Sequence, residues 1–166
     1  MATTITLKGN EVHTIGTLPA VGSTIRDFAL VDSGLNVKTL ENFEGKKKIF
    51  NIFPSVDTPV CAASARTFNE KASALDNTVV INVSKDLPFA LGRFCAAEGL
   101  DKVETLSDFR SSFGDDYEVT IADSVFKGLL SRAIIVADEN NKVVYTEQVP
   151  EIANEPDYEA ALSAVK

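Results

Sequence analysis

The sequence predicts an α/β fold in which a central mixed β-sheet is flanked by helices. Two apolar runs rich in β-branched residues, 46–53 and 78–83, have the pattern of strands that are buried on both faces. A helical segment follows each run, and near the C-terminus two further apolar runs, 133–137 and 143–149, flank a turn-forming stretch at 138–142. Strands that alternate with helices and end in a hairpin indicate a layered α/β sandwich.

Two small β-hairpins precede the first buried strand. In the first, residues 5–7 and 11–15 flank Lys8-Gly9-Asn10, and in the second, residues 28–31 and 35–39 flank Asp32-Ser33-Gly34. Both turns contain the glycine and short polar residues that tight turns favour. His13, in the first hairpin, is expected to be a half-exposed strand residue without a catalytic partner nearby.

The first long helix is expected to run from Pro59 to about Leu75, because apolar residues recur on one face alternately four and three positions apart. Thr58 is placed to cap this helix, and Pro59 suits the first helical position, where no N–H is needed. Cys61 therefore lies in the first turn. There, free backbone N–H groups and the helix macrodipole favour a thiolate over a thiol. This makes Cys61 a candidate reactive thiol.

A second helix is expected after the strand 78–83. Asp86 is placed to cap it, Pro88 lies in its first turn, and Gly99 follows its end. Cys95 lies within this helix, beside Phe94.

The rest of the chain completes the predicted order of elements. A short strand is expected at 103–106, an irregular or weakly helical stretch at 109–117, and a closing helix from Pro156 to Lys166. A β-α-β unit followed by a β-β-α unit is the thioredoxin-like arrangement, to which the N-terminal hairpins are additions. We therefore expect a single domain over residues 1–166.

Composition and charge exclude several classes of function. The net charge is −8, and the basic residues are scattered apart from Lys46-Lys47-Lys48, which argues against binding to nucleic acid or to an anionic membrane surface. No apolar run approaches the ~18 residues that a membrane span needs. The N-terminus lacks the pattern of a secretory signal, so the expected location is the cytoplasm.

The two cysteines limit the chemistry further. Cys61 and Cys95 are 34 positions apart, which is no CxxC pair, and a permanent disulfide is not expected in a reducing compartment. Together with His13 they supply too few ligands for zinc. A free cysteine is most often a small buried hydrophobe, an interpretation that suits Cys95 but not Cys61 at its helix start.

A thiol that reduces peroxide must be ionised, shielded from water and placed beside a group that polarises the O–O bond. Thr58 is placed to direct its hydroxyl at the peroxide or the sulfur, and Pro54 to shield the thiolate. An arginine would supply a fixed positive charge with several donors. Arg132 is the best candidate, because it immediately precedes the buried strand 133–137. Arg66 and Arg93 are weaker candidates.

These residues resemble the active-site pattern of the peroxiredoxin family, Pro54-x-x-x-Thr58-x-x-Cys61. Further segments are similar to its bacterial thiol peroxidase (Tpx) subfamily and span the whole chain. They are 57–69 around Cys61, 86–90 with 93–99 around Cys95, 127–133 and 155–158. One departure is Glu118, which stands where such proteins usually carry glycine after the tyrosine and which is expected to affect only a loop conformation.

The resemblance implies an atypical two-cysteine peroxidase that acts on hydrogen peroxide and alkyl hydroperoxides. Cys61 would be the peroxidatic cysteine and would form a sulfenic acid, and Cys95 of the same chain would resolve it as a disulfide, which thioredoxin would reduce. No metal, flavin or nucleotide would be needed, and a homodimer would be expected. Because both cysteines are predicted on helices, we expect local unwinding around them between the two redox states.

Three other functions use the same residues. A non-enzymatic redox sensor or binding module would use the two cysteines as a switch without turnover. A disulfide reductase would favour a CxxC motif, which is missing, and a hydrolase would pair Cys61 with His13.

Overall fold

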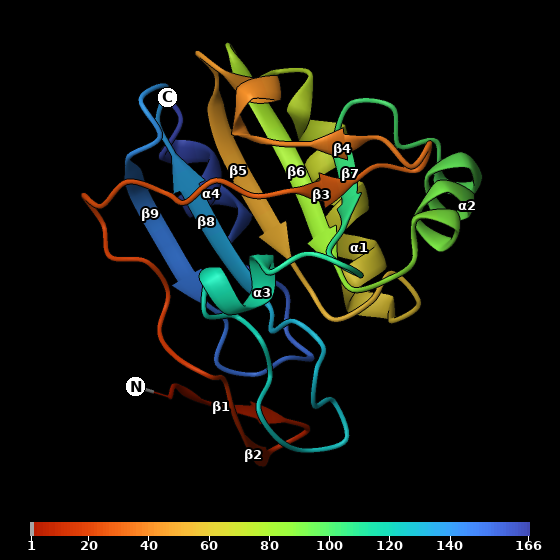
Figure 1. Ribbon diagram of the computed structural model, residues 1–166, viewed down its shortest axis with the longest axis vertical. Coiled ribbons are helices and arrows are strands. Elements are labelled where there is room, and N and C mark those ends of the chain that lie inside the picture. The colour runs from red at the N-terminus through yellow and green to blue at the C-terminus, as the bar shows by residue number, and fades with distance from the viewer. Residues whose placement is uncertain (1) are drawn as a thin grey trace.

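A seven-stranded mixed β-sheet forms the centre of the computed structural model, which describes residues 2–166 (Figure 1). From one edge to the other its strands are β4 (Val37–Lys38), β3 (Leu30–Val31), β7 (Glu104–Ser107), β6 (Thr78–Ser84), β5 (Lys47–Ile52), β8 (Ala133–Ala137) and β9 (Val143–Gln148). β5 lies between β6, to which it is parallel, and β8, to which it is antiparallel, and all three are interior strands of the sheet. The continuous apolar pattern of β5, β6 and β8 follows from this central position, because both faces of these strands are covered.

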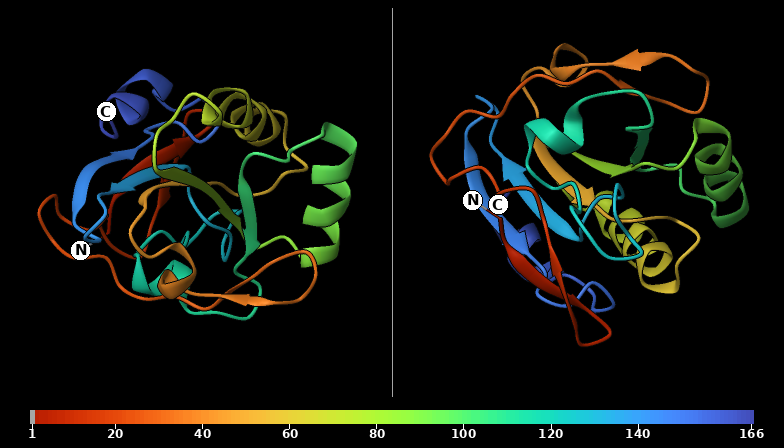
Figure 2. Two further views of the ribbon diagram at one scale, coloured as in Figure 1. Left: turned by 90° about the horizontal axis from the view of Figure 1, so that it is seen from above. Right: turned by 60° about the horizontal axis from the view of Figure 1, so that its bottom comes forward.

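Helices cover both faces of the sheet. α1 (Pro59–Ala72) and α4 (Tyr158–Ser163) lie on one face, and α3 (Phe113–Asp116) lies on the other together with the chain that leads into β3 (Figure 2). α2 (Pro88–Glu98) lies beside β7 (Figure 1). The longest helix of the described chain has 14 residues, so none is long enough to cross a bilayer, which requires about 20.

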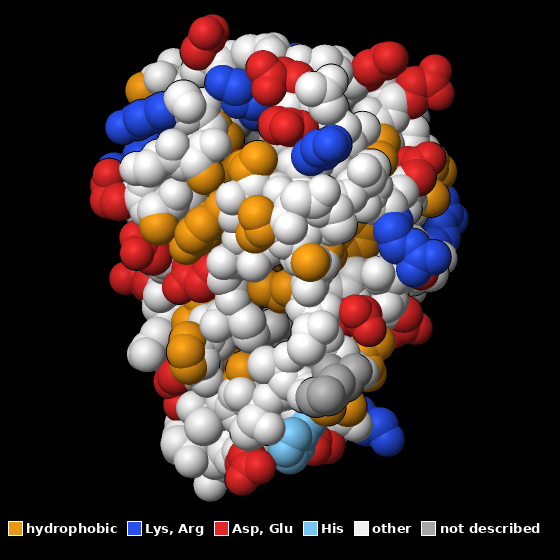
Figure 3. Space-filling view, turned by 90° about the vertical axis from the view of Figure 1, so that its left-hand side faces the viewer, with side chains coloured by type: hydrophobic (Ala, Val, Ile, Leu, Met, Phe, Trp, Pro, Cys, Tyr) orange, Lys and Arg blue, Asp and Glu red, His pale blue; other side chains and the backbone are white. Residues whose placement is uncertain are grey.

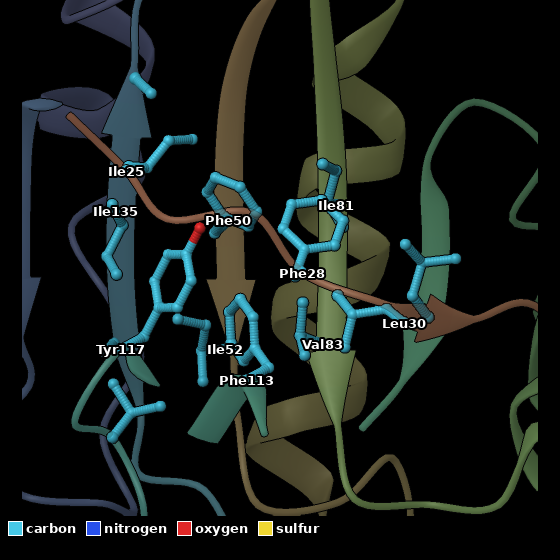
Figure 4. Packing of buried hydrophobic residues seen from close by; sticks show 14 of the residues in the cluster. Ile25, Phe28, Leu30, Phe50, Ile52, Ile81, Val83, Phe113, Tyr117 and Ile135 are labelled. Atoms are coloured by element: carbon cyan, nitrogen blue, oxygen red, sulfur yellow. The ribbon is translucent and has the colours of Figure 1, made fainter. Parts of the chain in front are cut away.

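Each face of the sheet has its own apolar core. On the α3 side, aromatic rings of Phe28, Phe50, Phe113 and Tyr117 pack together, and the Phe113 and Tyr117 rings are stacked with centroids 4.2 Å apart (Figure 4). On the α1 and α4 side, Phe68 packs among aliphatic residues of the strands and of α4. These two cores hold the strand ends that carry the candidate site.

The N-terminal hairpin is a separate two-stranded sheet, as predicted. It consists of β1 (Thr4–Leu7) and β2 (Asn10–His13) and projects beyond one end of the main sheet (Figure 1). Its backbone is bonded to the segment after β9, since Thr6 donates to the Pro150 carbonyl and Ile152 donates to the Thr6 carbonyl, both at 2.8 Å. The hairpin is therefore attached to the same segment that contacts Arg132.

Several predicted boundaries were wrong. α1 ends at Ala72 rather than Leu75, and α4 begins at Tyr158 with Asp157 as its cap, not at Pro156. The Asp157 carboxylate accepts a hydrogen bond from the Ala160 N–H, which fixes the start of α4. A 3-10 helix at Leu40–Phe43 had not been predicted, and the second hairpin is reduced to the short strands β3 and β4.

Glu118 adopts a backbone conformation that normally belongs to glycine. Its φ is +59°, in the left-handed region that favours glycine, the residue expected here from the family resemblance. The Glu118 side chain lies against Gly16, where an added Cβ would collide with the carboxyl group. Glu118 itself is exposed, between the buried residues Tyr117 and Val119.

Candidate active site

Cys61 lies buried at the start of α1, where the sequence placed it. It is the third residue of the helix, and its side chain is 0 % exposed. Phe53, Val56 and Leu91 enclose it together with Phe94 of α2. An apolar enclosure of this kind keeps bulk water away from the sulfur and strengthens any charge acting on it.

Arg132 supplies that charge. The residue precedes β8 and is 2 % exposed, and its Nη2 donates to the Cys61 Sγ at 3.1 Å. Its Nε donates to the Ile152 carbonyl at 2.6 Å, which fixes the plane of the guanidinium. Nη1 has no hydrogen-bond partner among residues 2–166, although it is buried. The arginine therefore holds the sulfur with one nitrogen and offers a second, unoccupied donor beside it.

Thr58 and Pro54 also lie at the site. Thr58 was predicted to cap α1 with its side chain, and this prediction is wrong. Thr58 occupies the cap position, yet its hydroxyl donates to the Ser55 carbonyl at 2.8 Å and makes no bond to a helix N–H. The Ser55 carbonyl, three residues earlier in the same loop, thus takes the hydroxyl that was expected to bond to the helix. Pro54 is buried and lines the same cavity as Thr58 and Arg132.

The residues that line this cavity come from five separate segments of the chain. One side of the cavity is formed by Pro54, Thr58, Pro59 and Val60, at the start of α1, and Arg132 also lines it. The other walls are formed by Leu7 and Lys8 of the hairpin, Phe126, Ile152 and Ala153. Phe126 lines the cavity, whereas Phe50 and Phe53 are core residues.

Glu151 fixes the hairpin wall of the cavity. Its carboxylate accepts hydrogen bonds from the backbone N–H groups of Lys8, Gly9 and Ala153, at 3.1, 2.9 and 2.9 Å, and from the Thr6 hydroxyl at 3.0 Å. These donors lower the pKa of Glu151 to about 2, with the Ala153 N–H as the largest cause. We call these hydrogen bonds of Glu151 the Glu151 clasp. They join the hairpin turn to the segment whose Ile152 carbonyl accepts a hydrogen bond from Arg132.

Asp86 holds the loop between β5 and α1, a role that the sequence analysis missed. It was predicted to cap α2, but the cap position belongs to Leu87. The Asp86 carboxylate instead accepts from the Ser55 hydroxyl and the Val56 N–H, at 2.7 and 2.9 Å, and from the Ser84 hydroxyl at 2.7 Å. Because Asp86 follows β6, it ties the ends of two neighbouring parallel strands together beneath the site.

Cys95 lies in the third turn of α2 and is half-buried. Burial raises the pKa of its thiol, and the Thr105 side chain opposes this by hydrogen bonding. Cys61 and Cys95 are both free thiols in the structure. The local unwinding expected for a disulfide between the two helices stays a prediction.

The other candidate residues lie elsewhere. Arg66 pairs with Glu98 at 3.3 Å, and the Arg93 guanidinium lies 3.9 Å from Asp57. His13 is half-exposed as predicted, but it does have partners, since its Nδ1 lies 2.8 Å from Asp123 and its Nε2 3.2 Å from Glu11. Figure 3 shows this single histidine beside acidic side chains at the hairpin end of the molecule. The two carboxylates raise the pKa of His13, chiefly through the bond to Asp123.

Comparisons with known proteins agree on one family. Residues 20–162 match the Redoxin family. The chain is 58% identical to the thiol peroxidase of Mycobacterium tuberculosis over 161 residues, covering 97% of each chain. It is 54% identical to that of Corynebacterium glutamicum over 158 residues, covering 95% of this chain and 96% of the relative.

Solved structures give the same picture. A peroxiredoxin-like protein from Aquifex aeolicus superposes with a TM-score of 0.93 at 35% identity, over 99% of this chain and 96% of that one. A thiol peroxidase from Chromobacterium violaceum superposes with a TM-score of 0.88 at 27% identity, over 95% of this chain and 91% of that one.

Proposed function

The chain belongs to the Redoxin family, among its thiol peroxidases, and is a thiol-dependent peroxidase; on this premise we propose that Cys61 is the peroxidatic cysteine and Cys95 the resolving one. The observation that carries the proposal is the 3.1 Å contact between Arg132 Nη2 and the Cys61 sulfur inside an apolar enclosure. A buried cation in contact with a cysteine favours the thiolate, which is the form that attacks peroxide.

The first step takes place at the Cys61 sulfur, beside Arg132. The Cys61 thiolate attacks the nearer peroxide oxygen, so that an S–O bond forms while the O–O bond breaks. The departing oxygen takes up a proton and leaves as water or an alcohol, and Cys61 is left as a sulfenic acid. Arg132 Nη1, a buried donor without a partner among the described residues, is placed to bind the peroxide oxygens as negative charge shifts between them.

In the second step Cys95 condenses with the sulfenic acid. The Cys95 sulfur attacks the Cys61 sulfur, an S–S bond forms, and the S–O bond breaks with loss of water. Both cysteines lie on helices, and a disulfide needs Cα atoms within about 7 Å, so this step includes unwinding of α1 and α2 near the cysteines.

The proposal extends to substrate, reductant, assembly and location. The substrates are hydrogen peroxide and alkyl hydroperoxides, the reductant of the disulfide is thioredoxin, and the enzyme acts as a homodimer in the cytoplasm. The apolar walls of the cavity, including Leu7 and Phe126, suit an alkyl group next to the reacting oxygens. A cysteine pair that is re-reduced in every cycle suits a compartment that keeps thiols reduced.

Two matched variants test the cysteine roles. With thioredoxin, its reductase and NADPH, a trace of the wild type should consume many equivalents of peroxide. Cys61→Ser should consume none, and Cys95→Ser should consume one equivalent and then stop. Normal cycling by Cys95→Ser would contradict its resolving role.

The same assay separates the enzyme from its rivals. A redox sensor would consume one equivalent of peroxide in the wild type as well. A hydrolase based on Cys61 and His13 is disfavoured because His13 is held by Asp123 and Glu11 on the hairpin. Peroxidase activity that survives His13→Ala would exclude it.

A further inference from the structure

The segment after the last strand of the sheet binds the Arg132 side chain, although it lies outside the helices and strands. β9 ends at Gln148, and α4 does not begin until Tyr158. Between them the Ile152 carbonyl accepts the hydrogen bond from Arg132 Nε at 2.6 Å. Because no helix or sheet ladder fixes this carbonyl, its direction has to be set by other contacts.

The N-terminal hairpin holds Ile152 by its backbone and by its side chain. The Ile152 N–H donates to the Thr6 carbonyl of β1 at 2.8 Å. The Ile152 side chain is 2 % exposed and belongs to the apolar cluster that contains Ile5 and Val12 of the hairpin. The residue whose carbonyl binds Arg132 is therefore anchored to the hairpin.

The Glu151 clasp adds a second anchor beside the first. Its carboxylate accepts three hydrogen bonds from the hairpin, which come from the Thr6 hydroxyl and the N–H groups of Lys8 and Gly9. One carboxylate oxygen, Oε2, accepts from both the Lys8 N–H and the Ala153 N–H, at 3.1 and 2.9 Å. A single atom thus joins the hairpin turn to the segment after β9.

One planar peptide group connects the clasp to the active site. The Ala153 N–H, which donates to Glu151, and the Ile152 carbonyl, which accepts from Arg132, belong to the same peptide group. A trans peptide is planar, with its N–H and C=O directed to opposite sides, so a partner that holds the N–H also fixes the direction of the carbonyl. The contacts therefore run from the Glu151 carboxylate through this peptide to Arg132, whose Nη2 donates to the Cys61 sulfur at 3.1 Å.

We infer that Glu151 is a positioning residue for the peroxidase reaction: it anchors the peptide group between Ile152 and Ala153 to the hairpin and thereby sets the orientation of the Arg132 guanidinium at the Cys61 sulfur. The inference rests on the proposed roles of Cys61 and Arg132. Donors that are already oriented accelerate a reaction, because they do not have to reorganise as charge develops. If the acceptor of Nε moves, both the contact of Nη2 with the sulfur and the direction of Nη1 change.

This role differs from that of a cavity wall. Leu7 and Lys8 of the hairpin line the cavity, so a hairpin that is only a wall affects substrates through their organic group. The orientation of Arg132 affects every peroxide in the same way, because each one presents the same O–O bond to the sulfur. Hydrogen peroxide carries no organic group to contact the wall, and it therefore distinguishes the two roles.

Glu151→Ala tests the inference with two peroxides. The rate of sulfenic acid formation in the reduced full-length protein is measured by quench-flow and mass spectrometry, with hydrogen peroxide and with cumene hydroperoxide. Both rates should fall about 2- to 12-fold, the factor expected from the loss of one net hydrogen bond. In NMR spectra the Nε–H of Arg132 should exchange with water faster in the variant. A slower reaction with cumene hydroperoxide alone would reduce Glu151 to a support of the wall and would overturn the inference.

A double-mutant cycle tests whether Glu151 acts through Arg132. In the Arg132→Met protein there is no Nε to orient, so adding Glu151→Ala should slow the reaction with hydrogen peroxide no further. A general loss of structure would instead multiply the two effects, since the effects of independent substitutions add in free energy. An undiminished effect of Glu151→Ala in the Arg132→Met protein would overturn the inference.

Two further variants complete the experiment. Glu147→Ala is the matched control, because Glu147 is half-buried and accepts from the Asp157 N–H of the same segment at 2.9 Å, away from the hairpin; its rates should equal those of the wild type. Glu151→Gln keeps one acceptor oxygen, so its rates should lie between those of the wild type and Glu151→Ala, and it replaces Glu151→Ala in the cycle if the alanine variant does not fold.

The outcomes separate this inference from the proposed function. A folded Glu151 variant that reacts with hydrogen peroxide at the wild-type rate, or a Glu147→Ala protein that is slowed as much as Glu151→Ala, would overturn the positioning role alone. An Arg132→Met protein that reacts at the wild-type rate would instead overturn the proposed role of Arg132, on which the inference rests.

Discussion

Replacing Arg132 with methionine should separate the reactivity of the enzyme from its stability. Methionine has a similar length and leaves no buried charge. The exchange removes the hydrogen bond to the Cys61 sulfur and the bond to the Ile152 carbonyl, and it also removes the unsatisfied Nη1. The sulfur loses the charged partner that it has in the structure, while the apolar enclosure of Phe53, Val56 and Leu91 stays in place.

The size of the kinetic effect follows from the lost contact. A hydrogen bond to a charged group contributes about 1.5–3 kcal/mol, and about 1.4 kcal/mol corresponds to a factor of ten in rate. Arg132→Met should therefore react with peroxide about 10- to 150-fold more slowly. The free energy of unfolding should stay the same or rise, because apolar replacement of a buried charged group is often neutral or stabilising.

The rate of the first step is best measured by quench-flow and mass spectrometry, since the chain has no tryptophan to report on it. Unfolding in urea gives the stability. Arg132→Lys is the matched control: it keeps the charge but not the planar fork that reaches both acceptors, so its rate should lie between those of the wild type and Arg132→Met. A folded Arg132→Met protein that reacts within threefold of the wild-type rate would refute the argument.

Three further predictions concern the rest of the molecule. Glu118→Gly should raise the free energy of unfolding by about 1 kcal/mol and the melting temperature by about 2–4 °C, because glycine adopts the left-handed backbone conformation without strain. Glu118→Ala removes the charge but keeps the strain, so an equal gain from alanine would mean that the charge, not the backbone, is responsible. Asp157→Ala should lower the free energy of unfolding by about 1 kcal/mol through loss of the α4 cap, which thermal unfolding would detect, and no loss would mean that the cap is not stabilising. The pKa of Glu151 is depressed in the folded protein, so the stability it contributes is complete above the pKa of an unfolded glutamate and is lost as the pH falls towards about 2. The amide NMR signals of Lys8 and Gly9 should accordingly titrate with a midpoint near pH 2, and a midpoint above 4 would contradict the clasp.

The strands and the place of Cys61 could be predicted because their signals are local. Apolar runs mark β5, β6 and β8, and Pro59 marks the start of α1, whatever the rest of the chain does. The prediction that Arg132 would lie near the sulfur needed only the position of one residue at a strand end. In the structure its Nη2 donates to the Cys61 sulfur at 3.1 Å, and its role in the reaction stays a proposal.

Other features depend on partners that are distant in the sequence. Asp86 satisfies the ordinary rules for a helix cap, but Ser55 and Val56 offer it better partners across the sheet, 31 and 30 positions away. The hydroxyl of Thr58 was predicted to cap a helix but bonds to the backbone of its own loop, and its role towards the peroxide stays a prediction. The buried hydrogen bond between Asn51 and Asn82 did leave a signal, since each is a lone amide within a buried apolar strand, but only the register of the sheet brings them together.

The Glu151 clasp joins two parts of the protein that contribute different components of the site. The proposed reactive groups, Cys61 and Arg132, belong to the thioredoxin-like sheet and its first helix, whereas Leu7 and Lys8, which also line the cavity, belong to an appended hairpin joined on by its turn. Substitutions in the hairpin turn can thus change this wall of the cavity while leaving the Cys61 sulfur and the Arg132 guanidinium in place. Trimming the N-terminus of this protein would consequently take away a wall of the reaction chamber, not a dispensable tail.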